Sequence, residues 1–158
     1  MPQNPDVVLE WGPSVPDVTV RADSRRLAMV VRNLVGNALK FTDRGWVRAE
    51  MLVEGSEAVL RVSDTGIGIA PEDQDRVFEM FRQADGSDSR RYAGTGLGLY
   101  LVRRFVEQLG GRVDLMSTVG RGSVFTVRMP RVGAVPAGAP ARGPTAPGGR
   151  PRAGDDRA

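Results

Sequence analysis

The sequence contains no cysteine and no histidine among its 158 residues. The absence of cysteine excludes disulfides and thiolate chemistry. The absence of histidine as well excludes the usual zinc sites, imidazole general bases and Ser-His-Asp triads. No apolar run approaches the roughly 20 residues of a membrane span, and the first residues lack the pattern of a signal peptide. We therefore expect a soluble, cytoplasmic protein that makes no membrane contact.

Lysine is also scarce: Lys40 is the only lysine among the 22 basic residues. The chain has 19 acidic residues. Residues 131–158 hold five Arg and two Asp, and their net charge of +3 equals that of the whole chain. Residues 1–130 then balance at 17 basic and 17 acidic residues. Because the excess charge lies in the tail, the composition does not support nucleic-acid binding by the domain.

The tail over 131–158 contains six Gly, five Pro and seven Ala, with Val132 and Val135 as its sizeable apolar residues. Such a segment buries too little apolar surface to offset the entropy of ordering it, so we predict that it is disordered. It either anchors an acidic partner or is an extension without a function, and the composition favours the second interpretation.

The hydrophobic periodicity predicts one domain over residues 7–130, after a flexible start over 1–6. Strands are expected where apolar residues alternate, and helices where they recur every three to four residues. The predicted strands are Val7–Trp11, Val18–Arg21, Trp46–Val53, Ala58–Ser63, Arg112–Ser117 and Ser123–Met129, and the predicted helices run from the N-cap Asp23 to Lys40, from Glu72 to Phe81, and from Gly94–Gly98 to Leu109. This order predicts an α/β (α+β) two-layer sandwich with three helices on one face of a mixed, largely antiparallel sheet.

The first predicted helix carries a polar stripe beside its apolar face. Asn33, Asn37 and Lys40 follow one another at helical spacing, about 120° from the apolar residues. The stripe is either a solvated face or a site for a metal ion and phosphate, in which an amide oxygen ligates Mg²⁺ and the ammonium meets a terminal phosphate. Phe41, at the edge of the stripe, could cover a base or belong to the core.

Two glycine segments follow. Asp64-Thr65-Gly66-Ile67-Gly68 comes after a strand, so the carboxylate could accept from an exocyclic amine such as that of adenine. Taken alone, this segment favours a tight turn with an Asx hydrogen bond. The run Gly94–Gly98 opens a helix and is a natural phosphate cradle, although it matches neither the P-loop nor the dinucleotide fingerprint.

Taken in order, these segments resemble the motifs of bacterial sensor histidine kinases. NLVGNALKFT (33–42) resembles the N box, SDTGIGIAPEDQDRVFEMF (63–81) the first glycine box and F box, and GTGLGLYLVRR (94–104) the second glycine box. The closing GRGS (120–123) is similar to the last glycine motif. The resemblance covers about residues 7–130 and points to the GHKL superfamily of ATP-binding domains, whose fold is an α/β sandwich.

The resemblance implies a site for ATP and Mg²⁺. Asn37 would ligate Mg²⁺, Lys40 would meet the phosphates and Phe41 would line the nucleotide. Asp64 would bond the adenine amino group, in a pocket shaped by Gly66 and Gly68. The other nucleotide contacts would come from Gly94, Thr95, Gly96, Leu97, Gly98 and Ser123.

The resemblance also implies how the γ-phosphate is handled. Residues 82–95 would form a mobile lid, in which Arg90 or Arg91 would stabilise the γ-phosphate. ATP-hydrolysing relatives carry a water-activating Glu where this sequence has Asn33, which cannot act as a carboxylate base. We therefore expect phosphoryl transfer to a separate nucleophile rather than hydrolysis.

The expected acceptor is a histidine on a separate dimerisation domain, and through it a response regulator. Because this chain has no histidine, we expect a fragment, an excised domain or a stand-alone subunit that acts in trans, and a monomer. Two alternatives stay open: a free-standing Ser/Thr kinase that resembles anti-sigma-factor kinases, and a non-catalytic nucleotide-binding interaction module.

Overall fold

The computed structural model describes residues 4–13, 18–80 and 96–133. Its five strands form one sheet in the order β1-β2-β3-β5-β4. They are β1 (Val7–Trp11), β2 (Gly45–Glu54), β3 (Glu57–Asp64), β4 (Arg112–Thr118) and β5 (Gly122–Pro130). β1 pairs with β2 in parallel, and all other neighbours are antiparallel. The sandwich predicted from the sequence is confirmed.

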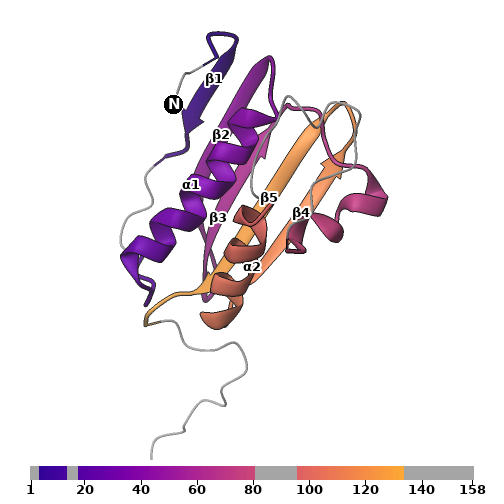
Figure 1. Cartoon of the computed structure of the whole chain (residues 1–158). Coiled ribbons are helices and arrows are strands. Elements are labelled where there is room, and N and C mark those ends of the chain that lie inside the picture. Colours follow the sequence, from indigo (N-terminus) through magenta and orange to yellow (C-terminus); the bar gives the residue numbers. More distant parts are fainter. Residues whose placement is uncertain (1–3, 14–17, 81–95, 134–158) are drawn as a thin grey trace, which may run out of the picture.

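The helical layer covers one face of this sheet (Figure 1). It contains α1 (Ser24–Lys40), α2 (Gly98–Gln108) and, between them along the chain, the short 3₁₀ helices η1 (Pro71–Asp73) and η2 (Arg76–Phe78). Asp23 caps α1 as predicted, because its side chain accepts the N–H of Arg25 at 2.8 Å.

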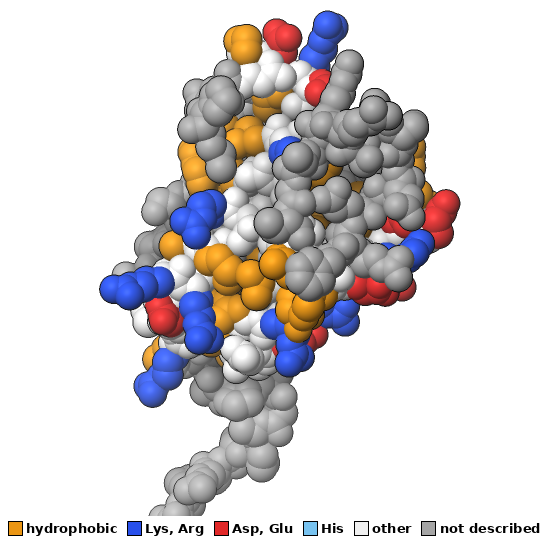
Figure 2. Space-filling view, viewed as in Figure 1, with side chains coloured by type: hydrophobic (Ala, Val, Ile, Leu, Met, Phe, Trp, Pro, Cys, Tyr) orange, Lys and Arg blue, Asp and Glu red, His pale blue; other side chains and the backbone are white. Residues whose placement is uncertain are grey.

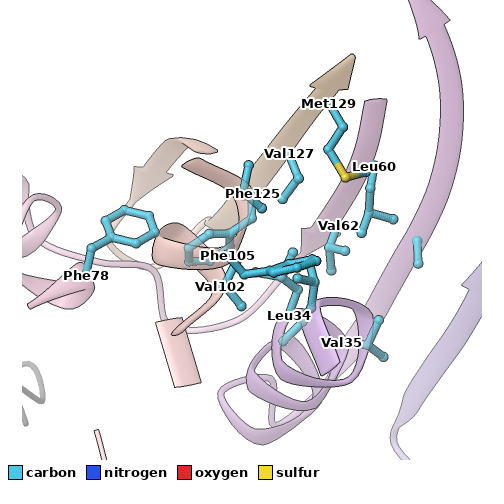
Figure 3. Close-up of a cluster of buried hydrophobic side chains, with 14 of the residues drawn as sticks. Leu34, Val35, Leu60, Val62, Phe78, Val102, Phe105, Phe125, Val127 and Met129 are labelled. Atoms are coloured by element: carbon cyan, nitrogen blue, oxygen red, sulfur yellow. The ribbon is translucent and has the colours of Figure 1, made fainter. Parts of the chain in front are cut away.

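The core lies between the helical layer and the sheet. Leu34 of α1 and Phe105 of α2 pack toward the inward-facing residues of β3 and β5, such as Val62 and Val127 (Figure 3). Phe78 of η2 extends this core toward β5, with its ring in edge-to-face contact with Phe125 at 6.2 Å between centroids. The inward positions alternate along the strands, so the apolar pattern sets the register of the sheet.

The opposite face of the sheet carries ion pairs between different strands, some of them across an intervening strand. Arg48 pairs with Glu10 at 2.8 Å, and Arg112 pairs with Glu57 at 2.6 Å. Arg128 of β5 pairs with Glu54, and its guanidinium lowers the pKa of that carboxyl. Charges of opposite sign thus face each other on this surface.

The predicted strand Val18–Arg21 is wrong, because the segment makes a single isolated bridge, from Val20 to Arg131. Up to Pro130, β5 already has β3 on one side, and β4 occupies its other side up to Arg128. The segment therefore meets β5 only beyond the end of that strand.

The predicted helix over Glu72–Phe81 is also wrong as a continuous α-helix, because the chain forms η1 and η2 there. The segment is fixed at two points, where the Gln74 side chain donates to the carbonyls of Ile69 and Ser117 and where Phe78 enters the core. These anchors interrupt the α-helical hydrogen-bond ladder. The last predicted helix, α2, begins at Gly98.

Within the described ranges, no helix is both long and apolar enough to cross a membrane. The predicted tail lies outside the described residues from 134 onward.

The core packing predicts a large effect at Leu34, which is 1% exposed. Leu34→Ala should lower the free energy of unfolding by about 2–5 kcal/mol, because it removes buried methyl groups and leaves a cavity. Leu101→Ala is the control, since Leu101 is 44% exposed and should change stability by about 0.5 kcal/mol or less. Urea denaturation checks both values, and equal losses would contradict this assignment of the core.

Candidate functional site

The polar stripe of α1 lies where the sequence predicts it. Asn33, Asn37 and Lys40 are half-buried on one side of the helix. The helix ends directly after them, because Phe41 donates its N–H to the carbonyl of Asn37 at 3.0 Å. Lys40 Nζ lies 5.0 Å from the centroid of the Phe41 ring, and burial lowers the pKa of Lys40.

The backbone of Phe41 joins this stripe to the first glycine segment. Its carbonyl accepts the N–H of Ile67 at 3.1 Å. A Cβ on Gly66 would lie 2.3 Å from the same oxygen, closer than a side chain tolerates. Glycine at position 66 therefore permits the approach of the loop to the end of α1.

Asp64 is the buried charged residue of this region, at 8% exposure. Its Oδ1 accepts the N–H of Gly66 at 2.8 Å, which is the Asx turn expected from the sequence. Burial raises the pKa of Asp64, while the backbone N–H groups of Gly66 and Ser123 act in the opposite direction. A carboxylate has about four lone-pair positions, so Asp64 can accept a further hydrogen bond.

The loop after Asp64 is fastened to the turn between β4 and β5. Ile69 donates its N–H to Ser117 Oγ at 2.7 Å, and Gly120 donates its N–H to the carbonyl of Ile67 at 2.8 Å. Gly68 has a φ of +72°, and a Cβ there would lie 2.1 Å from the carbonyl of Thr118. The loop is thus held on this side by the Ser117 hydroxyl and by the backbone of the turn.

Sequence reasoning missed Ser117. Its hydroxyl lies 2.8 Å from that of Ser123, which is opposite it in the register of β4 and β5. Both serines stand on the inward face of strands whose other inward residues, such as Leu115 and Phe125, are apolar. A polar residue at an inward position is the signal that could have revealed them.

The N-terminus of α2 meets the stripe of α1 at Asn33. A Cβ on Gly98 would lie 2.6 Å from Asn33 Oδ1, so the two helices approach closely there. Asn33 Nδ2 donates to the carbonyl of Met29 at 2.9 Å, which fixes the orientation of the amide. Gly96, just before this helix, has a φ of +66°, and Leu97 occupies the N-cap position.

The described contacts therefore form two groups, one of Phe41, Asp64, Gly66 and Ser123 and one of Asn33 and Gly98. Asn37 and Lys40 lie on α1 between these groups. The remaining predicted site residues, Arg90, Arg91, Gly94 and Thr95, lie outside the described residues, as does the predicted lid.

This arrangement offers a buried acceptor beside the end of α1, where the Lys40 ammonium lies, and amides and glycine backbone from there toward the start of α2. Among the described residues, no cluster of His, Cys, Asp and Glu could hold a metal ion. A cation at the stripe would thus be held by amide oxygen and by the oxygens of its ligand, as Mg²⁺ is when phosphates fill its coordination shell.

Comparison with known proteins identifies the class. Residues 22–133 match the family model described as histidine kinase-, DNA gyrase B-, and HSP90-like ATPase. The circadian input-output histidine kinase CikA of Synechococcus elongatus is 49% identical over 111 residues, which are 70% of this chain and 15% of that protein. The signal transduction histidine-protein kinase BarA of Escherichia coli is 42% identical over 127 residues, 76% of this chain and 14% of BarA.

Solved structures agree with this result. Full-length ShkA in complex with AMPPNP shares 35% identity at a TM-score of 0.69, with 83% of this chain and 27% of that chain covered. The mycobacterial sensor histidine kinase MprB shares 27% identity at a TM-score of 0.68, with 81% of this chain and 84% of that chain covered.

The chain belongs to the histidine kinase-, DNA gyrase B- and HSP90-like ATPase family, as an ATP-binding catalytic domain of the sensor histidine kinase type. It spans about a seventh of the length of the curated relatives CikA and BarA.

The raised pKa of Asp64 predicts how pH changes stability. Between its ordinary value of 3.8 and its higher folded value, the folded state binds more protons than the unfolded state. The stability of the wild type relative to Asp64→Asn should therefore fall as the pH rises from about 4, and level off above the folded pKa. Urea denaturation of both proteins across this range tests it, and a constant difference would contradict the direction of the shift.

Proposed function

We propose that this domain binds Mg²⁺-ATP and donates the γ-phosphoryl group to a histidine on a separate dimerisation domain. The observation that carries the proposal is the buried Asp64, held by Gly66 beside the end of the helix that presents Asn37 and Lys40. Asp64 would receive the base, and the stripe that ends beside it would meet the phosphates.

Asp64 would accept from the adenine amino group. Its low exposure makes an unmet acceptor costly, which favours a base that donates at this position. Gly66 and Gly68 would let the base lie close to the backbone, and Ser123 supports the Asp64 carboxylate through its own N–H. Phe41 would line the nucleotide from the end of α1.

The stripe of α1 would meet the phosphates. Asn37 would ligate Mg²⁺, which would neutralise phosphate charge, and Lys40 would add a point charge one turn later. The backbone of Gly96, Leu97 and Gly98 would contribute N–H groups at the start of α2. Gly94 and Thr95 would extend this cradle, and Arg90 or Arg91 would stabilise the γ-phosphate.

Transfer is favoured over hydrolysis because of Asn33. An amide cannot take a proton from water, and the described geometry has this amide donating to Met29 and packed against Gly98. Phosphoryl transfer needs mainly positioning and charge neutralisation. The acceptor imidazole would bond to the γ-phosphorus while the bond to the ADP oxygen breaks, and this acceptor must come from another domain because the chain has no histidine.

The first experiment is a calorimetric titration with a non-hydrolysable ATP analogue, with and without Mg²⁺. Binding that depends on Mg²⁺ supports the proposal. An absence of binding at millimolar analogue would contradict the nucleotide site.

Asn37→Ala should abolish the Mg²⁺-dependent part of analogue binding, because it removes the amide oxygen assigned to the metal. Ser24→Ala is the control, as an exposed polar substitution at the start of the same helix. Thermal unfolding of both variants confirms that they are folded. Unchanged Mg²⁺ dependence in the Asn37 variant would refute the ligand role.

Asp64→Asn should remove the preference for ATP over GTP, because the new amide group presents a donor where the carboxylate accepted. The loss should be about 1–3 kcal/mol for one buried hydrogen bond. Competition of ATP and GTP against the bound analogue measures it, with the fold checked by circular dichroism. A variant that still prefers ATP would show that the base is recognised elsewhere.

A further inference from the structure

The domain is neutral as a whole, but its charges are not evenly distributed. α1 contains Arg25, Arg26, Arg32 and Lys40 and no acidic residue. On the uncovered face of the sheet, in contrast, arginines pair with carboxylates of other strands. The arginines of η2 and α2 also pair with carboxylates of the helical layer. The positive charge of α1 is therefore not balanced within that helix.

Ion pairing divides the described arginines into two sets of equal size. Among the described residues, seven arginines form ion pairs: Arg48, Arg61, Arg76, Arg103, Arg104, Arg112 and Arg128. The other seven include Arg21, Arg25, Arg26 and Arg32, which fall within twelve residues of sequence. We call these four exposed residues the α1 basic face. Figure 2 shows Lys and Arg side chains at the lower left, where Figure 1 places the first half of α1.

The charges at the start of α1 oppose the stability of the helix. Arg25 and Arg26 lie in its first turn, which holds no acidic residue, although the N-terminus of a helix favours negative charge. Arg26 does have a structural role, because it donates to Gln108 of α2 and lies over the Phe105 ring. Arg25 makes no side-chain contact of this kind within the described residues, so the fold does not explain its charge.

Steering of the nucleotide does not explain this charge either. Twelve residues of helix separate Arg25 from Asn37, a distance of about 18 Å along the axis. The Debye length at physiological ionic strength is about 8 Å, so exposed charges at this distance are largely screened from the site. Arg25 therefore acts on something that contacts it directly, whereas Arg32 lies only about 7.5 Å from Asn37 along the axis.

We propose that the α1 basic face docks an acidic protein surface. Asp23 borders the face, and this carboxylate would repel a uniformly anionic bilayer or nucleic acid but suits a partner of mixed charge. The planar guanidinium groups of the face can bind carboxylates in a bidentate manner, and arginine is enriched at protein interfaces. This proposal does not depend on the nucleotide site.

The test measures binding of a fluorescent deca-glutamate peptide by anisotropy. The double variant Arg21→Glu and Arg25→Glu, which lies away from the stripe, should weaken binding about tenfold, because two contacts are lost and two repulsions are added. The control is Arg44→Glu with Arg121→Glu, which changes the net charge equally at two other exposed arginines without ion pairs among the described residues. It should weaken binding less than twofold.

Further measurements separate this role from the alternatives. A structural role for the face would lower the thermal midpoint of the double variant, whereas we expect no loss, because Glu at position 25 suits the helix N-terminus. Equal weakening by both double variants would overturn the proposal in favour of net charge alone. A second binding test uses vesicles of equimolar phosphatidylserine and phosphatidylcholine. The proposal would be overturned in favour of a membrane if these vesicles bind the wild type but not the double variant and displace the peptide. Unchanged binding of the ATP analogue by the face variant keeps the result separate from the nucleotide site.

Discussion

The close approach between the end of α1 and the loop after β3 is the constraint on which the site depends. It rests on one carbonyl, that of Phe41, which accepts the N–H of Ile67 and lies against Gly66. The same residue donates its own N–H to Asn37 and so ends the helix. The position of the amide stripe relative to Asp64 is therefore fixed by backbone contacts.

Two sets of contacts hold the end of α1 and the loop after β3 in place. Below them, Leu34 and Val62 join α1 to the sheet within the core. Beside them, Ser117 and Gln74 hold the loop and the first 3₁₀ helix to the end of β4. The loop after β3 is therefore largely preorganised, because its backbone groups are already paired with neighbouring segments.

Local patterns predicted those parts of the fold that depend on neighbouring residues. Asp23 as an N-cap, the periodicity of α1 and the hairpin between β2 and β3 are short-range features, and the structure confirms them. The strand expected at Val18–Arg21 failed because its partner, β5, is already paired along its length, which no local pattern reveals. The expected helix over 72–81 failed because Gln74 and Phe78 are bound by distant residues.

For the site, the motifs identified side chains but not the contacts that arrange them. The sequence places Asn33, Asn37 and Lys40 on one stripe, and the structure agrees. The contacts of the Phe41 carbonyl and the packing of Asn33 against Gly98 cannot be predicted from the sequence, because every residue type has the same backbone groups. The ion pairs that leave the arginines of α1 apart from the others are hidden too, since the charges of residues 1–130 cancel in the composition.

The solitary lysine has a practical consequence for handling the domain. Its ε-amine is the one side-chain amine of the chain, and it lies beside Phe41. Amine-directed dyes, biotin reagents and cross-linkers would therefore converge on this one position and on the chain terminus. Attachment through an introduced cysteine avoids this, since the sequence has no thiol of its own to compete. The same residue that complicates conventional coupling thus offers a single, chemically unique reporter position.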